Sequence, residues 1–370
     1  MGLLSVLTRS GKPGGASSQR AIAWYCGDSW EDWGPGNLEC GVAGSQQAVI
    51  YLSKEWAKQG HAVNVYNRCG AQEGVHDGVE YIPFTKFEQQ KQYDVLIIWR
   101  EAGIGMLDVP LKANRIILEL HDIPVRESRF TESRLKQIDR IFVKSRFHKD
   151  GITKNPRFRF IPRSKFVIIP NGINIHQLPA DQARDPYSLI YASNYPRGLE
   201  YMLKYGWPLI KKEIPRARLD VYYGWQHYDY FSGNEKRRAW KAMMIDLMKD
   251  SGVVDHGRVG CEELLRIKAR TSIHYYGSIW PETDCISIWE SAAVGCVPVT
   301  TAYGPLGEKG YCLSVKGDPR EAKTQEALAH KIIALFNDSR MVEKLRRRFR
   351  KSAQKNSWRV VAGEWSKSFI

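Results

Sequence analysis

Long apolar segments are missing from this sequence of 370 residues. Its hydrophobic stretches, such as residues 95–99, have the length of buried strands, and none approaches the roughly 18 residues that a membrane-spanning helix needs. The first twenty residues mix Gly, Ser, Lys and Arg and lack the apolar segment of a secretory signal. We therefore expect a loose lead-in over residues 1–20 and a soluble, cytoplasmic protein that is at most peripheral at a membrane.

Closely spaced cysteines are absent as well. The seven cysteines are odd in number, widely scattered and never spaced as C-x-x-C. This pattern argues against a cysteine-bound zinc and is typical of reduced thiols in a cytosol-like compartment.

Nucleic-acid-binding signatures are also lacking, although the chain is basic. Its 55 Lys and Arg outnumber its 40 Asp and Glu, which gives a net charge of +15. Such a field attracts polyanions, nucleotides or acidic lipid surfaces. No aromatic RNA-binding motif, zinc spacing or helix-turn-helix pattern accompanies the charge. We expect no nucleic acid partner and favour a phosphate-containing substrate, while a polyanion-binding α/β protein stays open as an alternative.

The sequence does contain a regular alternation of strand and helix patterns. Residues 21–26 read as a buried strand, residues 45–59 as a helix that Gly60 closes, and residues 61–66 as a second strand, which together make a βαβ unit. Alternation of this kind predicts a parallel sheet. Further strands are expected at residues 93–99, 115–120, 140–143 and 166–169.

The pattern restarts in the second half, after a polar run at residues 179–186 that contains two prolines. A chain of this length exceeds what one hydrophobic core usually serves. We predict two Rossmann-like α/β domains with parallel sheets facing a cleft, at residues 1–175 and 176–355, and a C-terminal segment 356–370 that crosses back to the first domain. The second-half elements are strands at 188–192, 218–223 and 272–276, helices at 198–214 and 261–269, and a helix and strand over 284–301.

Chemistry-bearing residues concentrate at the start of the helix expected near residue 285. Thr283 or Asp284 suits the N-cap, and the free amides of Cys285 and Ile286 together with the helix dipole make a site for a diphosphate. Glu282 precedes the helix and Glu290 lies about two turns inside it. Because carboxylates accept hydrogen bonds from vicinal hydroxyls, their natural partners are sugar and ribose hydroxyls on either side of the phosphates. Two surface glutamates on an ordinary helix are the alternative for this segment taken alone.

This segment resembles the retaining glycosyltransferases of family 4. Glu282 and Glu290 have that family's spacing, residues 295–300 (GCVPVT) follow as its glycine, proline and valine turn and strand, and residues 303–308 (YGPLGE) look like its next loop. The resemblance implies a GT-B fold, contact of Glu282 with the donor sugar, and contact of Glu290 with the nucleotide ribose. It covers most of the chain and is strongest between Arg258 and Glu308, and with it we place Arg258 and Val259 in the donor site.

Residues 193–198 (SNYPRG) lie where the second domain's first strand should end. The guanidinium fork of Arg197 could hold phosphate oxygens and offset charge on a departing nucleotide. The family usually has Gly-Arg, a gap and Lys-Gly, and this chain resembles only the later pair. One expected cation is therefore missing or comes from elsewhere, and an ordinary surface arginine is the alternative.

Residues 41–45 (GVAGS) come directly before the first long helix, where glycine lets backbone and substrate approach closely. They resemble the family's glycine-rich loop near the donor diphosphate and the acceptor, so we place Gly44 in the donor site and Ser45 in the acceptor site. The departures are Ala43, where many relatives have Gly, and Gln46, where many have Glu. The segment lacks the G-x-G-x-x-G pattern of a dinucleotide site.

Three further places supply candidates. His121 ends an expected strand and is assigned to the donor sugar, with Asp122 as a helper. Trp30 and Trp33, in an aromatic and acidic loop, are candidates to stack on an acceptor, although a packed loop explains them equally well. The basic stretch from Lys344 to Lys351 has helical character, and peripheral contact with an anionic membrane is weighed against a solvated helix face.

Together these features predict a retaining glycosyltransferase that moves a sugar from a nucleotide-sugar donor, such as a UDP-, GDP- or ADP-sugar, to a hydroxyl of a glycan, glycolipid or glycoprotein acceptor. The sequence has no D-x-D motif, and enzymes of the resembled family do not generally depend on a divalent metal, so we expect no metal or other cofactor. We assign Glu282, Arg197 and His121 to catalysis. The alternative is a catalytically silent nucleotide-sugar-binding or scaffold protein of the same fold.

Overall fold

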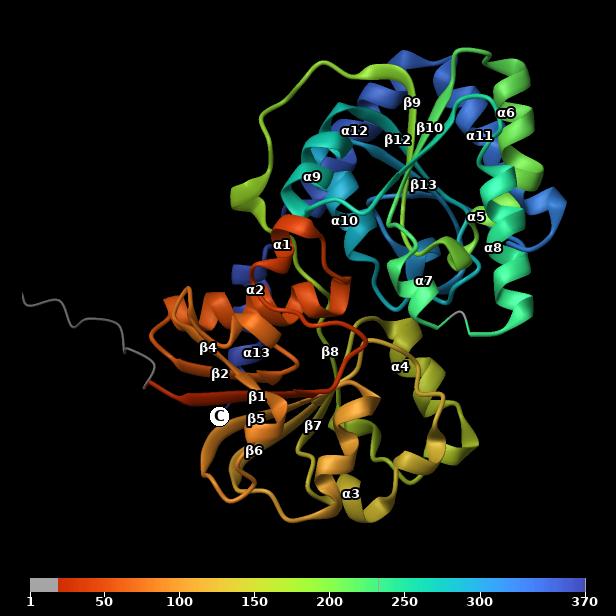
Figure 1. Ribbon diagram of the computed structural model, residues 1–370. Coiled ribbons are helices and arrows are strands. Elements are labelled where there is room, and N and C mark those ends of the chain that lie inside the picture. The colour runs from red at the N-terminus through yellow and green to blue at the C-terminus, as the bar shows by residue number, and fades with distance from the viewer. Residues whose placement is uncertain (1–18, 232, 370) are drawn as a thin grey trace, which may run out of the picture.

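The computed structural model describes residues 19–231 and 233–369, and it places two α/β units one beside the other (Figure 1). Most of the lead-in expected at residues 1–20 lies outside the described residues. The first unit contains an eight-stranded sheet and the second a six-stranded sheet. Neither sheet includes a strand of the other, so each unit has its own core.

The first sheet has the strand order β3-β4-β2-β1-β5-β6-β7-β8. All its neighbours are parallel except β3 and β4, which form an antiparallel hairpin at one edge. Ile22 of the central strand β1 pairs with Val63 on one side and Val95 on the other, and all three side chains are buried. The strands are β1 (Ala21–Gly27), β2 (Ala62–Asn67), β3 (Gly74–His76), β4 (Val79–Pro83), β5 (Tyr93–Trp99), β6 (Ala113–Glu119), β7 (Arg140–Val143) and β8 (Phe166–Ile168).

The predicted βαβ unit is confirmed. Helix α2 (Gly44–Lys58) joins β1 to β2 and buries its apolar residues, among them Leu52 and Trp56, against the sheet. Gly60 follows with φ 87°, a left-handed conformation that suits glycine and ends the helix. The hairpin of β3 and β4 was not predicted, because the two strands are short and one of them is exposed. The other helices of this unit are α1 (Asn37–Cys40), α3 (Glu132–Lys136) and α4 (Arg146–Thr153).

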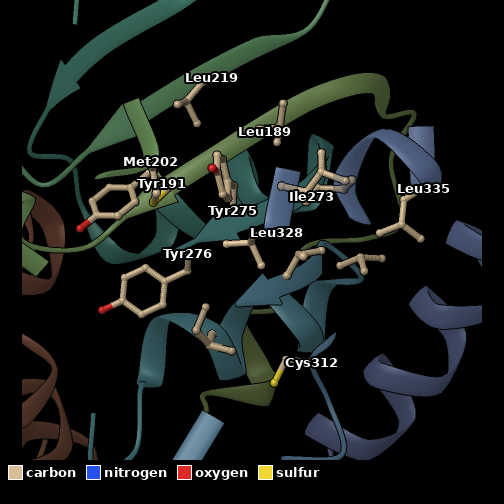
Figure 2. Packing of buried hydrophobic residues seen from close by; sticks show 14 of the residues in the cluster. Leu189, Tyr191, Met202, Leu219, Ile273, Tyr275, Tyr276, Cys312, Leu328 and Leu335 are labelled. Atoms are coloured by element: carbon tan, nitrogen blue, oxygen red, sulfur yellow. The ribbon is translucent and has the colours of Figure 1, made fainter. Parts of the chain in front are cut away.

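The second sheet is parallel throughout, in the order β11-β10-β9-β12-β13-β14. Figure 2 shows its core, where Leu189, Leu219 and Ile273 from three adjacent strands meet Leu328 from a covering helix. Strand β12 is buried along its whole length, as expected for a strand of a parallel sheet with helices on both faces. The strands are β9 (Asp185–Ala192), β10 (Arg218–Tyr222), β11 (Val253–Gly257), β12 (Thr271–Tyr276), β13 (Val297–Thr301) and β14 (Leu313–Val315).

Helices cover both faces of this sheet. The single helix predicted at 198–214 is divided into α5 (Leu199–Tyr201), a π-helical turn and α6 (Trp207–Glu213). Pro208 has no amide hydrogen to donate to the preceding turn, and this loss accounts for the local irregularity. The remaining helices are α7 (Gln226–Tyr230), α8 (Glu235–Leu247), α9 (Cys261–Arg270), α10 (Ile286–Val294), α11 (Ala322–Phe336) and α12 (Ser339–Ala353).

The last helix, α13 (Trp358–Ser366), packs on the first unit beside α2. Its Trp365 has no exposed surface and lies 5.6 Å from the ring of Trp24 and 5.5 Å from that of Trp56. Large buried aromatic rings contribute much of a core's stability. The C-terminal segment is therefore part of the first unit's core.

Helix α12 carries the basic stretch singled out in the sequence. Leu345 and Phe349 are buried against the second unit. Lys344, Arg347 and Lys351 are exposed, so the charge lies on the solvent face of the helix. In the described part of the chain, no helix has both the length and the apolar character needed to cross a membrane.

Candidate active site

A cavity of about 460 Å3 lies between the two units, at the carboxyl ends of their central strands. Segments that follow β1, β5 and β6 form one wall, and segments that follow β9 and β12 form the other. The first unit contributes Asp28, Ser29, Trp30, residues 42–47, Trp99, Arg100, His121 and Asp122, and the second contributes mainly Ser193, Asn194, Arg197, Tyr223, His227, residues 282–287 and Glu290.

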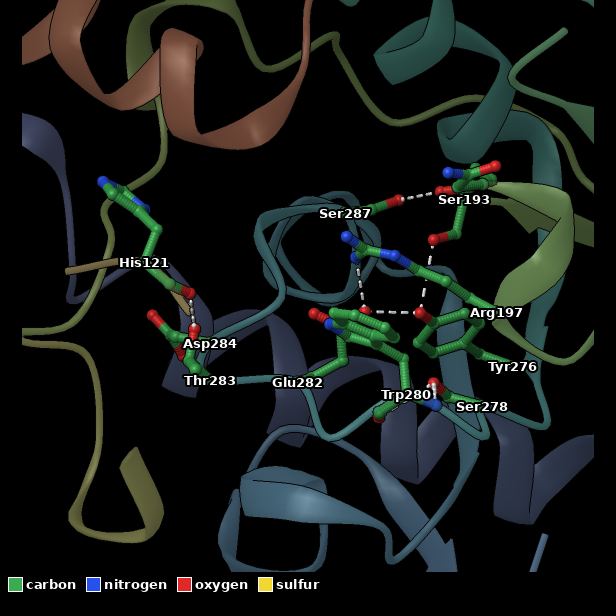
Figure 3. A network of polar contacts seen from close by, with 12 residues as sticks. His121, Ser193, Arg197, Tyr276, Ser278, Trp280, Glu282, Thr283, Asp284 and Ser287 are labelled. Carbon is green, nitrogen blue, oxygen red and sulfur yellow. Dashed lines mark hydrogen bonds and ion pairs between the residues drawn. The ribbon is translucent and has the colours of Figure 1, made fainter. Parts of the chain in front are cut away.

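Arg197 and Glu282 form an ion pair in the second-unit wall (Figure 3). The distance from Arg197 Nη1 to Glu282 Oε1 is 2.8 Å. Tyr276 donates its hydroxyl to the same oxygen at 2.6 Å, and the Oγ of Ser193 lies 3.2 Å from that hydroxyl. Burial disfavours the charge on the guanidinium, but Glu282 outweighs it and raises the pKa of Arg197 well above its ordinary value. Arg197 is therefore cationic at neutral pH.

Two glycines allow this pair to form. Gly198, with φ 125°, passes so close to the next loop that an added Cβ would lie 2.3 Å from the carbonyl oxygen of Gly277. Gly304, with φ 70°, would place a Cβ 2.7 Å from the carbonyl oxygen of Glu282. Only glycine combines such conformations with such close approach. These close approaches fix the backbone next to Arg197 and the backbone of Glu282 relative to the neighbouring loops.

Helix α10 begins beside this pair. Cys285, rather than Thr283 or Asp284, is its N-cap, and no side chain caps it. The first amides of a helix have no partner within it, so the amides of Ile286 and Ser287 are available at the cavity wall. The predicted anion site therefore begins one residue later in the chain than the sequence suggested.

Asp284 has a structural environment, which corrects its assignment to the donor. Its carboxylate is fully buried and accepts hydrogen bonds from the Asn171 amide at 2.7 Å, Lys309 Nζ at 2.7 Å and Trp289 Nε1 at 2.9 Å. Three donors leave it little capacity for a ligand. Thr283 is likewise engaged, because its hydroxyl donates to the carbonyl oxygen of His121 at 2.5 Å.

Glu290 lies on the same wall as predicted, but it already has two partners. Lys268 Nζ lies 2.6 Å from its Oε2, and Gln47 of the first unit donates to its Oε1 at 3.0 Å. The side chain of Lys268 has no exposed surface and also donates to the backbone oxygen of Ser287 at 3.1 Å. Lys268 was not expected from the sequence, where it is one of several cations on an amphipathic helix.

Gly44 begins helix α2 and faces the beginning of α10. A Cβ on Gly44 would lie 3.5 Å from the Cδ1 of Ile286, so the two helix N-termini are in contact distance of each other at the cavity. Ser45 lines the cavity beside it. Two helix N-termini directed at one space favour negative charge there.

His121 follows β6 and lines the first-unit wall. Its Nε2 lies 3.2 Å from Oε2 of the fully buried Glu119, which is also paired with Lys144. Burial lowers the pKa of His121 despite the nearby carboxylate, so the imidazole is neutral at pH 7. In Figure 3 its ring is directed away from the pair of Arg197 and Glu282.

Arg258 and Val259 line a narrow cavity of about 80 Å3 next to the main one. The guanidinium of Arg258 forms a two-pronged pair with Glu31 of the first unit, with N to O distances of 2.8 and 2.9 Å, and donates to the carbonyl oxygen of Gly41 at 2.6 Å. Trp30 borders both cavities, and its ring lies 5.1 Å from that of His227. The first-unit loop thus reaches the second unit at this point.

Trp33 does not line either cavity, which corrects its assignment to the acceptor. It has no exposed surface, and its ring lies 5.7 Å from that of Trp99 inside the first unit's core. A side chain without exposed surface has no face to offer a ligand. The packed-loop interpretation therefore holds for Trp33.

Arg100 is a cavity residue that the sequence did not reveal as such. It follows the apolar strand β5 directly, and this position at a strand end is the signal that could have found it. Among the described residues, no group of three or more His, Cys, Asp and Glu is arranged to hold a metal ion.

No protein-family model matches the sequence, and no curated protein does. Solved structures do match. A glycosyltransferase from Rickettsia africae has a TM-score of 0.70 at 13% identity, over 95% of this chain and 98% of that one. Sucrose-phosphate synthase from Thermosynechococcus elongatus has a TM-score of 0.68 at 16% identity, over 94% and 98%. HepE from Anabaena, in complex with UDP-glucose, has a TM-score of 0.68 at 12% identity, over 94% of this chain and 99% of that one. At these identities the likeness shows the fold, and the predicted GT-B class is confirmed.

Proposed function

We propose that this protein is a glycosyltransferase that moves a sugar from a nucleoside diphosphate sugar to an acceptor hydroxyl with retention of anomeric configuration. The observation that carries the proposal is the pair of Arg197 and Glu282, 2.8 Å apart beside the uncapped start of α10 in a cavity that both units line. A cation, free amides and a carboxylate are the groups that a diphosphate joined to a sugar requires.

The donor would bind mainly to the second unit. Its diphosphate would accept hydrogen bonds from the amides of Ile286 and Ser287 and from the guanidinium of Arg197. Glu282 would accept from the sugar hydroxyls and Glu290 from the ribose hydroxyls, because carboxylates are strong acceptors. The narrow cavity at Val259, bordered by the Arg258 pair, is the place proposed for the base.

The chemistry needs no protein nucleophile. The bond from the anomeric carbon to the phosphate oxygen breaks, the acceptor oxygen bonds to the anomeric carbon on the same face, and the acceptor proton passes to the departing phosphate. Arg197 and the start of α10 would stabilise the negative charge on that phosphate. The neutral imidazole of His121 would contact the sugar. With these charges in place, we propose that transfer requires no divalent metal.

The donor and acceptor classes proposed here are supported by the structural neighbours and by the residues of the cavity wall. The structural neighbours include HepE with UDP and with UDP-glucose, so a uridine nucleotide is the first donor to test. Trp30 and Ser45 would contact the acceptor, a glycan or a lipid-linked sugar. We also propose that the protein is cytoplasmic. The exposed cations of α12 would contact an anionic membrane surface.

The test is turnover of a panel of UDP-, GDP- and ADP-sugars by the purified protein, with and without EDTA. We expect nucleoside diphosphate release from one donor class, unchanged by EDTA, and a product whose anomeric proton coupling matches that of the donor. Glu282→Gln should abolish release while the unfolding temperature stays within a few degrees. Inversion of configuration, or normal release by that variant, would refute the assignment.

A catalytically silent binding protein is the second candidate, and two sequence observations favour it. Gln46 stands where many members of the resembled family have Glu, and the chain lacks one of that family's two donor-site cations. Donor binding in calorimetry without hydrolysis or transfer would support this candidate.

A further inference from the structure

Arg100 has a backbone conformation that non-glycine residues rarely adopt. Its φ of 59° and ψ of 179° lie in a region that is essentially restricted to glycine. The residue stands at the carboxyl end of β5, and its amide donates to the carbonyl oxygen of Glu119 at 2.7 Å. Such strain persists where the surrounding structure enforces it, and it is concentrated at functional sites.

Two contacts hold the Arg100 side chain at the cavity. Its Nη2 lies 2.7 Å from Oδ2 of Asp122, and its guanidinium carbon lies 5.2 Å from the ring centroid of Trp99. Within residues 19–231 and 233–369, the Nε and Nη1 of Arg100 have no hydrogen-bond partner, and 42% of the side chain is exposed. An arginine has five N–H donors in a planar fork, so one edge of this guanidinium is available.

Arg100 lies on the wall opposite the diphosphate-binding groups proposed above. Arg197 and the start of α10 belong to the second unit, whereas Arg100 belongs to the first. Of the described residues that form the first-unit wall, Arg100 is the only Lys or Arg. The two glutamates on the second-unit wall, opposite Arg100, already have cationic partners. Glu282 is paired with Arg197, and Glu290 is paired with Lys268.

Building on the proposed function, we propose that Arg100 binds an anionic group, a phosphate or a carboxylate, on the acceptor. The free edge of its guanidinium would form a two-pronged hydrogen bond with that group, while Asp122 and Trp99 keep the side chain in place. A neutral acceptor hydroxyl would not require a cation in a strained backbone conformation. The acceptor is thereby identified as a sugar or sugar derivative that carries negative charge.

The first experiment compares acceptors that differ in charge. With UDP-glucose or the donor found in the panel, UDP release is measured with glucose, glucose 6-phosphate and glucuronate as acceptor probes. We expect the two anionic probes to act at a KM about tenfold or more below that of glucose, since charge-assisted hydrogen bonds are the stronger class. Equal use of the neutral and anionic probes by the wild-type protein would overturn the proposal.

The second experiment uses Arg100→Gln and Arg100→Gly. Both should raise the KM for the anionic probe about tenfold or more and leave the dissociation constant for the donor unchanged. Arg100→Gly suits the backbone conformation and should keep or raise the unfolding temperature, which separates lost binding from misfolding. Arg126→Gln removes the same charge from an exposed position outside the cavity and should leave the KM unchanged. A weakened donor affinity in the Arg100 variants would instead place this residue in the diphosphate site.

Binding of glucose 6-phosphate in the presence of UDP, measured by calorimetry, makes the test independent of turnover. Loss of that binding in Arg100→Gln, with no nucleoside diphosphate release from any donor of the panel by the wild-type protein, would support the anion site and refute the glycosyltransferase. Equal transfer to neutral and anionic probes by both the wild-type protein and the variant would support the glycosyltransferase and refute the anion site.

Discussion

Gln47 of α2 donates a hydrogen bond to Glu290 of α10, with an Nε2 to Oε1 distance of 3.0 Å, and so joins the two units across the candidate active site. The other oxygen of Glu290 accepts from Lys268 at 2.6 Å. The glutamate that the sequence assigned to a ligand therefore also connects the units and neutralises a buried lysine.

Replacing Glu290 by Gln should reduce stability. Lys268 has no exposed side-chain surface, and breaking a buried ion pair by removing one partner costs about 3 to 5 kcal/mol. Urea unfolding should show this loss, and adding Lys268→Met should recover much of it, because the unpaired charge is then gone. Gln47→Ala should cost only about 1 kcal/mol, as expected for one hydrogen bond. A Glu290→Gln protein as stable as the wild type would show that the lysine is not dependent on this pair.

Arg197→Gln should reduce kcat about 100-fold or more, because a preorganised cation at the departing phosphate acts mainly in the transition state. The measurement is initial-rate nucleoside diphosphate release at saturating donor. Arg238→Gln removes a charge from an exposed position in the same unit and serves as the control. Equal rates in the two variants would exclude Arg197 from catalysis.

Gly198→Ala should disturb both the backbone and the site. The added Cβ would lie 2.3 Å from the Gly277 carbonyl oxygen, and φ 125° is unfavourable for alanine. We expect a loss of about 1 to 3 kcal/mol, the usual cost of such strain, together with a lower kcat because Arg197 precedes this residue. Gly233→Ala, where an added Cβ meets nothing within 4 Å, should leave both quantities nearly unchanged.

Stability should fall in mild acid because His148 is buried as a neutral imidazole. Its Nδ1 accepts from the Lys144 amide at 3.2 Å, its Nε2 lies 2.9 Å from the carbonyl oxygen of Asp122, and burial lowers its pKa from 6.5 to about 4. Between these values the unfolded chain binds more protons than the folded one, so the free energy of unfolding decreases as pH falls from about 6.5 to about 4. The contribution is about 3 kcal/mol at most.

Chemical unfolding between pH 7 and pH 4.5 measures this dependence. His148→Gln should be less stable than the wild type at pH 7 and should show a flatter decline toward acid. His330→Gln, on the outer part of α11, should keep the wild-type slope. An unaltered slope in His148→Gln would assign the acid sensitivity to other buried groups, such as His121 and His274, whose pKa values burial also lowers.

The fold was predictable from local pattern. The strand around Ile22, the helix that ends at Gly60 and the following strand form one βαβ unit within a residue or two of their expected bounds. Burial imposes a period of two on strands and 3.6 on helices, and these periods are visible in any continuous segment. The strands that the sequence did not predict, such as β4 and β11, are short or partly exposed, so their hydrophobic residues show no clear periodicity.

The sequence by itself determined the two-sheet α/β class and the order in which Arg197, Glu282 and Glu290 occur, because strand ends and helix starts are local features. Only the tertiary structure decided what each side chain meets. Asp284 is buried by Asn171 and Lys309, Trp33 by Trp99, and Arg100 is brought to the cavity. These outcomes depend on partners that are often far away in the chain, and no local period specifies which distant side chain will supply the hydrogen bond, the charge or the covering ring.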